Sequence, residues 1–532
     1  MGRRGEQLKR FGFLALVLGA AILAAPAWAQ SEAKGVVFHD RNGDGRRGPG
    51  EEGLRGVAVS NGREVVTTDA RGVWRLPVGE DTPFFVIKPR GWACPVDRNG
   101  LPQFYYLHKP NGSPRLRYPG VAPTGPLPAS IDFPLRRQRE PDRFEILVFG
   151  DPQPRNLWEV EMLAHDFVAP IAARGPKAAF ALVLGDLVFD PLDLHEPVVG
   201  AMGRLGIPMH YVQGNHDENY DADSDRHADE GFERVFGPPT YAFNYGRVHF
   251  LVLDDILFHP RDAQGRVGYH AELTEQQLEF IRNDLALVPK DRLIVYAFHI
   301  PVVELRNKEE FLKLFAGREH VFGLSAHTHT QYHLFLGPEH GWQGKQPHHH
   351  LVHVTACGNW WGGKPDYYGI PHATTSDGVP NGYSIVTFDG NRYRVEYRPA
   401  RLPDDYQMQV WVPDVVPANQ VAATNVYVNV FAGSSRSTVE MRVGDTGEWT
   451  RLTQVPAPEA ADVEAYRRVF SERMAPRAKY ENEYTLTGPV ASQHLWAGKL
   501  PAGTAPGYHL LRVRTTDMFG QTYTAARVFR VE

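Results

Sequence analysis

Short apolar runs recur between about residues 144 and 397, and each run has the length of a buried strand. These runs span residues 144–149, 179–184, 209–213, 248–253, 293–298 and 321–325, with later β segments at 351–355, 383–388 and 393–397. Helix-like patterns separate them at 157–174, near 195–205, and after Thr274, which with Gln277 has the spacing of a capping box. Strands that alternate with helices predict a layered α/β core.

The flanking regions have an all-β pattern instead. Strand candidates at 57–59, 64–67, 73–76 and 84–87 are separated by Gly, Pro and Asn, and 89–134 has the composition of long loops and a linker. After about Pro403, apolar and polar residues alternate with period two at 426–430 and 511–514, and 462–474 is expected to form one inserted helix. The predicted fold class is therefore an α/β, layered β-sandwich core with helices outside, flanked by two all-β sandwich-like domains.

The N-terminal residues have the organisation of a signal peptide. A basic region with Arg3, Arg4, Lys9 and Arg10 precedes the apolar stretch 11–25, and Ala27-Trp28-Ala29 is a small-x-small cleavage site. We expect the mature protein to begin at Gln30 and to be exported to the periplasm or the cell exterior; an uncleaved membrane anchor is the alternative. No later segment has the ~20 apolar residues of a transmembrane helix, so none is expected after cleavage.

These patterns define the predicted domains, which are a signal peptide at 1–29, an N-terminal β domain at 30–136, a central domain at 140–400 and a C-terminal β domain at 404–532. The 532 residues are 42% hydrophobic and 22% charged, which is typical of a globular protein with several domains. The formal net charge of −5 offers no basic field, so duplex nucleic acid is not expected as a partner. Cys94 and Cys357 fall in different predicted domains and are not expected to pair.

A candidate calcium loop lies in the N-terminal β domain. Asp40, Asn42 and Asp44 alternate along the chain before Gly45, and Glu51 occupies the twelfth position of the pattern. Oxygen ligands at this spacing can surround one hard cation, but the flanks are strands and not helices, so this is no EF-hand. Two interpretations stay open, a structural Ca²⁺ ion and a hairpin loop without metal.

Polar residues follow five of the central strands at the point where each strand ends. They are Asp151 and Gln153, Asp186, Asn215 and His216, His299, and His327 and His329. The carboxyl ends of strands are where α/β sheets place their sites. Oxygen and imidazole donors without thiolates suit Mn, Fe or Zn, and the set is large enough for two ions, the arrangement that hydrolyses phosphate esters.

The residues of these motifs and their order along the chain resemble those of the calcineurin-like metallophosphoesterase superfamily, over about residues 144–397. The motifs are Gly150-Asp151-Pro152-Gln153, Gly185-Asp186, Gly214-Asn215-His216-Asp217, Phe298-His299 and Ala326-His327-Thr328-His329. The flanking β domains are similar to those of a bacterial exported subgroup of that superfamily.

The resemblance implies a role for each of these residues. It implies that Asp186 bridges two metal ions, that Asp151, Gln153 and His329 complete one site, and that Asn215, His299 and His327 complete the other. His216 is implied to stabilise the phosphoryl oxygens or to protonate the leaving group, and Asp217 either orients His216 or caps a helix. A metal-bound hydroxide is implied to attack phosphorus in line, without a covalent intermediate.

Three departures from the family pattern change the expectation. Gln153 stands where His is usual, and its weaker, harder amide oxygen either favours Mn²⁺ or Mg²⁺ at the first site or lets that site bind metal loosely. Ala326 replaces the usual Gly. Phe189 stands three residues after Asp186, where purple acid phosphatases have a ligating Tyr, so we predict a protein without their colour.

The leading prediction is an exported metal-dependent phosphoesterase, either a phosphomonoesterase or a phosphodiesterase, which the motifs do not separate. Loops at 359–363, 366–368 and 372–377 could frame its substrate, and Trp360-Trp361 could either stack on a sugar or base or form a packed aromatic loop. Two alternatives stay open. One is an envelope-binding protein with a vestigial phosphate site, and the other is a nucleotide or sugar-nucleotide pyrophosphatase.

Overall fold

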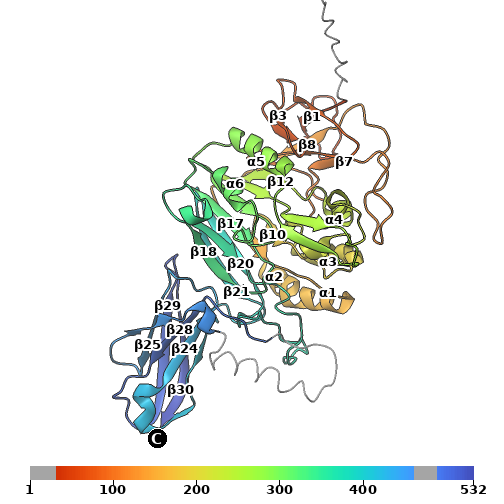
Figure 1. The fold of residues 1–532 in the computed structure, drawn as a ribbon. Helices are drawn as coiled ribbons and strands as arrows, with labels where there is room; N and C mark the ends of the chain where they lie inside the picture. The colour runs from red at the N-terminus through yellow and green to blue at the C-terminus, as the bar shows by residue number, and fades with distance from the viewer. Residues whose placement is uncertain (1–30, 461–487) are drawn as a thin grey trace, which may run out of the picture.

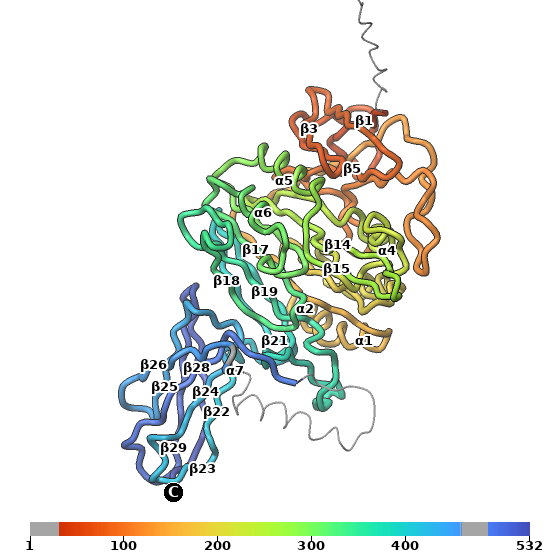
Figure 2. The backbone as a smooth tube through the Cα atoms, viewed as in Figure 1, coloured from red at the N-terminus to blue at the C-terminus, as the bar shows by residue number. Residues whose placement is uncertain are grey.

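A computed structural model describes residues 31–460 and 488–532 of the chain. The predicted signal peptide at 1–29 and the predicted helix at 462–474 lie outside the described residues. The first strands lie at one end of the molecule, a mixed α/β body follows, and the last strands form the other end (Figures 1 and 2). The exact domain boundaries stay a prediction.

The central body contains a five-stranded and a six-stranded sheet. The first has the order β11-β10-β9-β20-β21, with β9 (Arg143–Phe149), β10 (Ala181–Leu184) and β11 (Met209–Val212) parallel, and β20 (Gly382–Asp389) and β21 (Arg392–Pro399) antiparallel. The second has the order β12-β13-β16-β17-β19-β18, formed by β12 (Tyr241–Tyr245), β13 (Val248–Val252), β16 (Leu293–Ala297), β17 (Val321–Ser325), β18 (Tyr332–Leu336) and β19 (His348–Val352). Strands β13, β16, β17 and β19 are parallel to one another. One continuous apolar core joins the two sheets, with Val148 and Leu184 on one side and Leu251 and Val295 on the other.

Helices cover the outside of this sandwich. Those beside the five-stranded sheet are α1 (Leu157–Leu163), a π-helical turn (Ala164–Val168), α2 (Ala169–Arg174), α3 (His195–Met202) and α4 (Glu230–Phe236), and those beside the six-stranded sheet are α5 (Glu275–Leu287) and α6 (Lys308–Lys313). Helix α5 begins where the capping box predicts, since the Gln277 backbone N–H donates to Thr274 and the Thr274 backbone N–H donates to the Gln277 side chain. The predicted fold class is confirmed.

The N-terminal strands form two four-stranded sheets. One has the order β4-β1-β8-β6, with β1 (Glu32–His39), β4 (Val73–Pro77), β6 (Trp92–Ala93) and β8 (Phe133–Arg137), and the other has the order β3-β2-β5-β7, with β2 (Ala58–Ser60), β3 (Val65–Thr67), β5 (Thr82–Val86) and β7 (Tyr105–His108). The prediction of loops and a linker at 89–134 was therefore too simple. Strands β6 and β7 form there because they have pairing partners in β8 and β5, a long-range contact that the Pro-rich composition hides.

The N-terminal sheets are joined to the central body by apolar packing. Phe85 lies edge-on to Phe280 of α5 with ring centroids 5.5 Å apart, and Phe104 packs on Tyr241 of β12 at 4.7 Å. Buried residues of both regions belong to one continuous core. The ammonium group of Lys88 adds an ion pair to Glu140 at 2.6 Å and a hydrogen bond to the Asn244 carbonyl at 2.6 Å. Such an interface holds the two regions in a fixed relative position.

The last strands form a separate sandwich with its own apolar core. Its sheets have the orders β22-β24-β28-β27 and β23-β30-β29-β25-β26. They are formed by β22 (Met408–Trp411), β23 (Val415–Val416), β24 (Asn425–Val430), β25 (Thr438–Val443), β26 (Thr450–Arg451), β27 (Thr453–Gln454), β28 (Leu495–Lys499), β29 (Gly507–Thr516) and β30 (Thr522–Val531). Helical residues of α7 (Ala457–Ala460) follow β27. His494 of this sandwich contacts Asp377 of the central body, with Nε2 3.0 Å from Oδ2.

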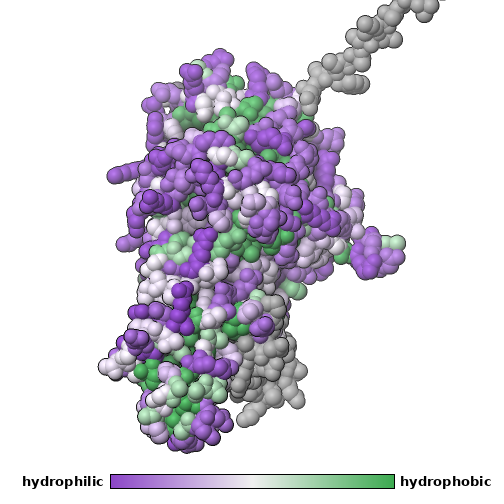
Figure 3. Space-filling model, turned by 60° about the vertical axis from the view of Figure 1, so that its left-hand side comes forward, coloured by the Kyte–Doolittle hydropathy of each residue, from purple (hydrophilic) through white to green (hydrophobic). Residues whose placement is uncertain are grey.

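The visible face of the molecule is mostly hydrophilic, with apolar side chains in small scattered patches, some of them on the C-terminal sandwich (Figure 3). Exposed apolar residues of that sandwich include Tyr508 and Val528. Across the described ranges, no helix has both the length and the apolar character that a bilayer crossing needs. Both cysteines carry free thiols.

Candidate metal centre

The loops after β9, β10, β11, β16 and β17 converge at one edge of the sandwich, because parallel strands end on the same side. All the strand-end residues predicted as metal ligands lie on these loops. The β-hairpin of β14 (Ile256–His259) and β15 (Gly268–Ala271) brings Tyr269 to the same edge, with its ring 6.3 Å from that of His327.

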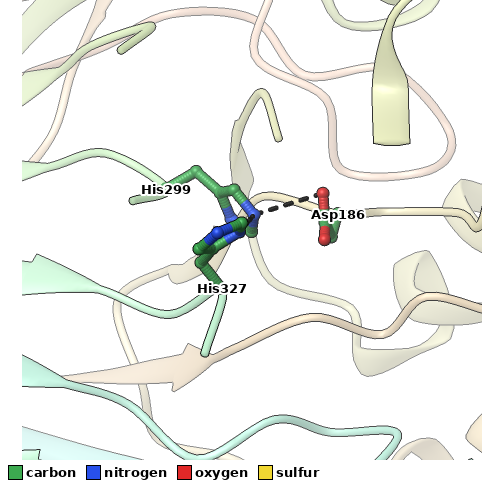
Figure 4. A group of neighbouring side chains, drawn as sticks. All are labelled: Asp186, His299 and His327. Carbon is green, nitrogen blue, oxygen red and sulfur yellow. Dashed lines mark hydrogen bonds and ion pairs between the residues drawn. The ribbon is translucent and has the colours of Figure 1, made fainter. Parts of the chain in front are cut away.

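Asp186, His299 and His327 form one compact cluster (Figure 4). One ligand atom of each residue lies within 4.8 Å of the others. His299 Nε2 is 3.2 Å from Asp186 Oδ1 and 3.1 Å from His327 Nδ1. On its other side, His299 Nδ1 donates to the Leu184 carbonyl at 2.8 Å, which directs Nε2 at the cluster, the orientation a metal-ligating histidine needs.

A second group lies beside the first. His329 Nε2 is 3.4 Å from Asp151 Oδ2, while its Nδ1 donates to the Gly358 carbonyl at 2.7 Å. Gln153 links the two groups, since its amide Nε2 donates to Asp186 Oδ2 at 2.8 Å. To ligate a cation, Gln153 would present its oxygen instead, which needs only a rotation of the carboxamide. As in His299, the outer ring nitrogen of His329 is thus fixed by a backbone carbonyl.

Asn215 supplies an independent sign of a missing partner. Asn215 is only 2% exposed, and its side-chain Oδ1 has no hydrogen-bond partner. A buried carbonyl oxygen without a partner is costly, and an amide oxygen is a suitable ligand for a hard or borderline cation. The residues present therefore fit divalent metal ions.

The backbone of the site is strained. Five of the predicted ligands have positive φ, namely Asp151 (20°), Gln153 (38°), Asp186 (47°), His327 (67°) and His329 (51°). Among the described residues, the other non-glycine residues with positive φ are Asp190, Trp360 and Arg401, and the first two also border this site. L-residues rarely adopt this region, and such strain gathers at functional sites.

Two glycines of the motifs are required by close contacts. A Cβ on Gly214 would lie 2.1 Å from the Asp186 backbone nitrogen, and one on Gly185, at φ 87°, would lie 2.5 Å from His299 Nδ1. The Gly-Asp and Gly-Asn-His spacing therefore follows from how tightly the loops pack.

The charges of the site depend on one another. Burial raises the pKa of Asp151 to about 8. Burial opposes ionisation of Asp186 as well, but the charge of His299 beside it holds the pKa of Asp186 below its usual value. Burial disfavours the His299 cation, yet Asp186 raises the pKa of His299 to about 10. Burial lowers the pKa of His327 to about 3, so that ring is neutral and able to ligate. Two buried carboxylates in contact with imidazoles are an environment that a divalent cation stabilises.

His216 stands at the edge of this centre and is partly exposed. Its backbone N–H donates to Asp186 Oδ1 at 3.0 Å, and its ring stacks on Phe189 with centroids 4.5 Å apart. Its Nδ1 lies 2.6 Å from Asp190 Oδ1. Burial opposes the charge of the ring, but the hydrogen bond to Asp190 raises the pKa of His216 above the usual histidine value.

Asp217 does not orient His216, which corrects one of the two roles predicted for it. Asp190 holds that position instead. The Asp217 carboxylate is fully buried and accepts backbone N–H groups of Leu187 at 3.0 Å and Gly214 at 2.9 Å. It also contacts His195 Nε2 at 3.0 Å. It therefore ties the Gly185-Asp186 loop to the Gly214 loop, in the manner of the alternative capping role.

Aromatic side chains surround the centre on several sides. Trp360 lies 5.3 Å from His329 and donates its indole N–H to the Gln153 carbonyl at 3.0 Å. Tyr220 donates to the Asn215 carbonyl at 2.8 Å. Trp361 is buried and bonded to Asp166, so one ring of the Trp-Trp pair lies at the site and the other packs in the core, while stacking on a sugar or base stays a prediction.

Two further residues position the site and were not predicted. Asp190 follows Asp186 by four residues, and Asp255 follows β13 at a sixth strand end. Asp255 is fully buried, and its carboxylate accepts the backbone N–H groups of His299 at 2.9 Å and Ile300 at 3.0 Å. Asp255 comes shortly after the apolar run 248–253, and this position in the sequence is the signal that could have identified it.

The candidate calcium loop lies among the N-terminal strands, apart from this centre. Asp40 Oδ1 accepts the Gly43 N–H at 2.6 Å, Asn42 Oδ1 accepts the Asp44 N–H at 2.9 Å, and Glu51 Oε1 accepts the Arg41 N–H at 2.9 Å. These bonds order the loop from within. The choice between a calcium site and a hairpin loop without metal stays a prediction.

Comparisons with known proteins identify a family through its sequence models. Family models described as calcineurin-like phosphoesterase, its N-terminal part and its C-terminal part match residues 144–331, 41–117 and 350–523. Among solved structures, the chain is similar to a purple acid phosphatase from yellow lupin (Lupinus luteus) seeds, with a TM-score of 0.34 and 12% identity over 64% of this chain and 66% of that chain, just under two thirds of its length. No curated protein matches the chain. Since the three matches follow one another along most of the sequence, the chain belongs to the calcineurin-like phosphoesterase family of metal-dependent phosphoester hydrolases.

Proposed function

We propose that this protein is an exported dinuclear phosphoesterase that hydrolyses phosphate esters by in-line attack of water. The position of Asp186 is the observation that carries the proposal. Its Oδ1 faces His299 of one ligand group, and its Oδ2 faces Gln153 of the other. A carboxylate with one oxygen toward each group is placed to bridge two ions.

The two groups and the buried oxygen of Asn215 support the ligand assignment that we propose. Asp151, Gln153 and His329 would hold one ion, and Asn215, His299 and His327 the other, with Asp186 shared. Nitrogen and oxygen donors suit Mn, Fe or Zn, and Mg²⁺ fits the oxygen-rich first group. Bound divalent ions supply Lewis acidity toward the phosphoryl group and activate the attacking water.

In the proposed reaction, protein side chains supply the proton that the leaving group needs. His216 is held by Asp190 through Nδ1, so its Nε2 is the nitrogen available to substrate. The hydrogen bond to Asp190 favours the protonated ring. A protonated imidazole at this edge can donate its proton to the departing ester oxygen. We assign His216 as the general acid and Asp190 as the residue that positions it.

The surroundings of the centre favour diesters over monoesters. Trp360 and Tyr269 offer ring faces for an ester substituent beside His329 and His327. The guanidinium of Arg155 lies over Trp360 but is also held by the buried Glu159 carboxylate, with Nε 3.0 Å from Oε1. A phosphodiester has two organic groups and one negative charge, whereas a phosphomonoester has one organic group and up to two charges. Aromatic walls therefore suit the diester better than the monoester dianion.

The test is hydrolysis of p-nitrophenyl phosphate and bis(p-nitrophenyl) phosphate in Mn²⁺, side by side, with metal content measured on the same samples. We expect the diester to react faster, and Asp186→Asn to lose at least about 100-fold in kcat together with bound metal. Asp389→Asn, the same change at an exposed ion pair with Arg143, is the matched control and should behave as wild type. Metal bound at the site without hydrolysis of either ester would refute the proposed reaction, and faster hydrolysis of the monoester would refute only the ester class.

A further inference from the structure

A cavity of ≈ 240 Å³ lies where the N-terminal strands meet the central body. Its walls are largely aromatic, with the rings of Phe104, Phe180, Tyr241, Phe243 and Tyr245 around it. Phe180 precedes β10, whereas Asp186 follows that strand, so the cavity opens at the end of the sheet opposite to the metal centre. Six residues of extended chain separate these two ends by about 20 Å. The cavity is therefore a site distinct from the catalytic edge.

Three alanines leave this space open. Ala93 comes from β6, Ala179 from the turn before β10, and Ala242 from β12, and all three line the cavity. Protein interiors are close-packed, and voids larger than a water molecule are few. A leucine in place of a lining alanine adds three carbons and would reduce this space. The three elements come from both sides of the interface, so no single poorly packed segment explains the cavity.

The charged side chain at the cavity, that of Lys88, already has partners. Lys88 Nζ is held by Glu140 Oε1 at 2.6 Å and by the Asn244 carbonyl at 2.6 Å. His210 Nδ1 lies 3.3 Å from the Tyr241 hydroxyl, and burial lowers the pKa of His210 to about 3, so its ring is neutral. Burial raises the pKa of the Cys94 thiol to about 12, so it is neutral as well. A charged ligand would lose its hydration here without gaining a free counter-charge.

We propose that this cavity binds a neutral, apolar ring compound of one or two fused rings. An apolar cavity of about 150 Å³ is large enough to hold benzene, so this one has room for a molecule the size of indole or naphthalene. The ring faces of its walls suit an aromatic guest, since offset and edge-on ring contacts add to the burial of apolar area. A ligand held between the two regions would bind the folded protein but not the unfolded chain, and would therefore stabilise the folded state.

The test uses the full chain and 5-fluoroindole followed by fluorine NMR, with thermal unfolding as a second measurement. We expect saturable line broadening with a Kd below about 1 mM and a rise in Tm. Ala93→Leu and Ala179→Leu, which fill the cavity from opposite sides of the interface, should each weaken binding at least about tenfold. Two filling variants are used so that misfolding of one, visible in its thermal transition, does not decide the outcome.

Whether the ligand binds in this cavity is tested at Cys94, whose thiol lines the cavity. Modification of Cys94 by a small uncharged thiol reagent, followed by mass spectrometry of the peptide, should slow at least about threefold when indole is bound. Cys357 is fully buried elsewhere and should stay unmodified in both samples, which shows that the protein remains folded during the reaction. Absence of saturable binding to wild type, or unchanged binding to both filled variants, would overturn the proposal. Phosphoesterase activity is not part of either readout, so the result does not depend on the proposed function.

Discussion

Nδ1 of His216 lies 2.6 Å from Oδ1 of Asp190, a residue in the left-handed region at φ 64°. Asp190 belongs to the same loop as Asp186, whose Oδ1 accepts the His216 backbone N–H. The ring and the backbone of His216 are therefore both fixed to the loop that carries the proposed bridging ligand. In the proposed reaction this arrangement would preorganise His216 as the proton donor, and it separates the position of Asp190 from that of Asp217.

Replacing Asp190 by Asn should affect esters according to their leaving group. Without the carboxylate, His216 is less well oriented and holds its proton less firmly, so proton donation to the leaving oxygen suffers. We expect kcat to fall about 10–100-fold on a methyl or other alkyl ester, and less than about threefold on a p-nitrophenyl ester, whose leaving group needs no proton. Steady-state kinetics with the two substrates measures this difference.

Asp193→Asn is the matched control, since Asp193 is an exposed neighbour on the same segment. It should leave both rates near those of wild type. An equal loss on both esters in Asp190→Asn would instead assign His216 to stabilising the phosphoryl oxygens.

Replacing Asp217 by Ala should lower stability. The change removes a fully buried acceptor and leaves the backbone N–H groups of Leu187 and Gly214 without a partner. We expect the free energy of unfolding to fall by about 2–4 kcal/mol, measured by urea denaturation. A free energy of unfolding within about 0.5 kcal/mol of the wild-type value would show that this carboxylate does not hold the two loops together.

The buried His353 should make stability fall in mild acid. Burial lowers the pKa of His353 to about 4, whereas an unfolded histidine titrates near 6.5. The unfolded chain therefore binds the proton more readily. The resulting stability is fully present above about pH 6.5 and is lost as the pH falls toward 4.

His353→Gln isolates this contribution, because glutamine can still hydrogen-bond Ser384, which His353 contacts at 2.9 Å, but does not titrate. Between pH 7.5 and 5, the stability gap between wild type and variant should narrow by about 2 kcal/mol, read from urea unfolding at both pH values. A gap that stays constant would show that His353 does not change its protonation over this range.

Export should remove the first 29 residues. The basic region, the apolar stretch and the Ala27-Trp28-Ala29 site predict that the mature chain begins at Gln30. N-terminal sequencing of protein recovered from the periplasm or the medium of an expressing bacterium checks this. Ala29→Arg should block cleavage, and the precursor should then stay with the membrane fraction. Recovery of an uncleaved soluble protein in the cytoplasm would contradict export.

The sequence by itself determined the catalytic edge. Apolar runs such as 144–149 and 179–184 are strands in the structure, and each predicted ligand follows a strand. This was readable because buried parallel strands are continuous apolar runs, and because parallel strands must end on the same edge. The glycines before Asp186 and Asn215 were visible as motifs, but the reason for them is tertiary, since a Cβ on Gly185 would meet His299 and one on Gly214 would meet Asp186.

Only the tertiary structure decided which carboxylate serves which neighbour. In sequence, Asp217 is adjacent to His216 and Asp190 is 26 residues away, yet Asp190 holds the imidazole and Asp217 faces the protein interior. Strands β6 and β7, the cavity between the N-terminal and central regions, and the division of Trp360 and Trp361 between the site and the core were likewise not visible in the sequence. Each depends on contacts between residues far apart in the chain, and periodicity and local spacing carry no information about such contacts.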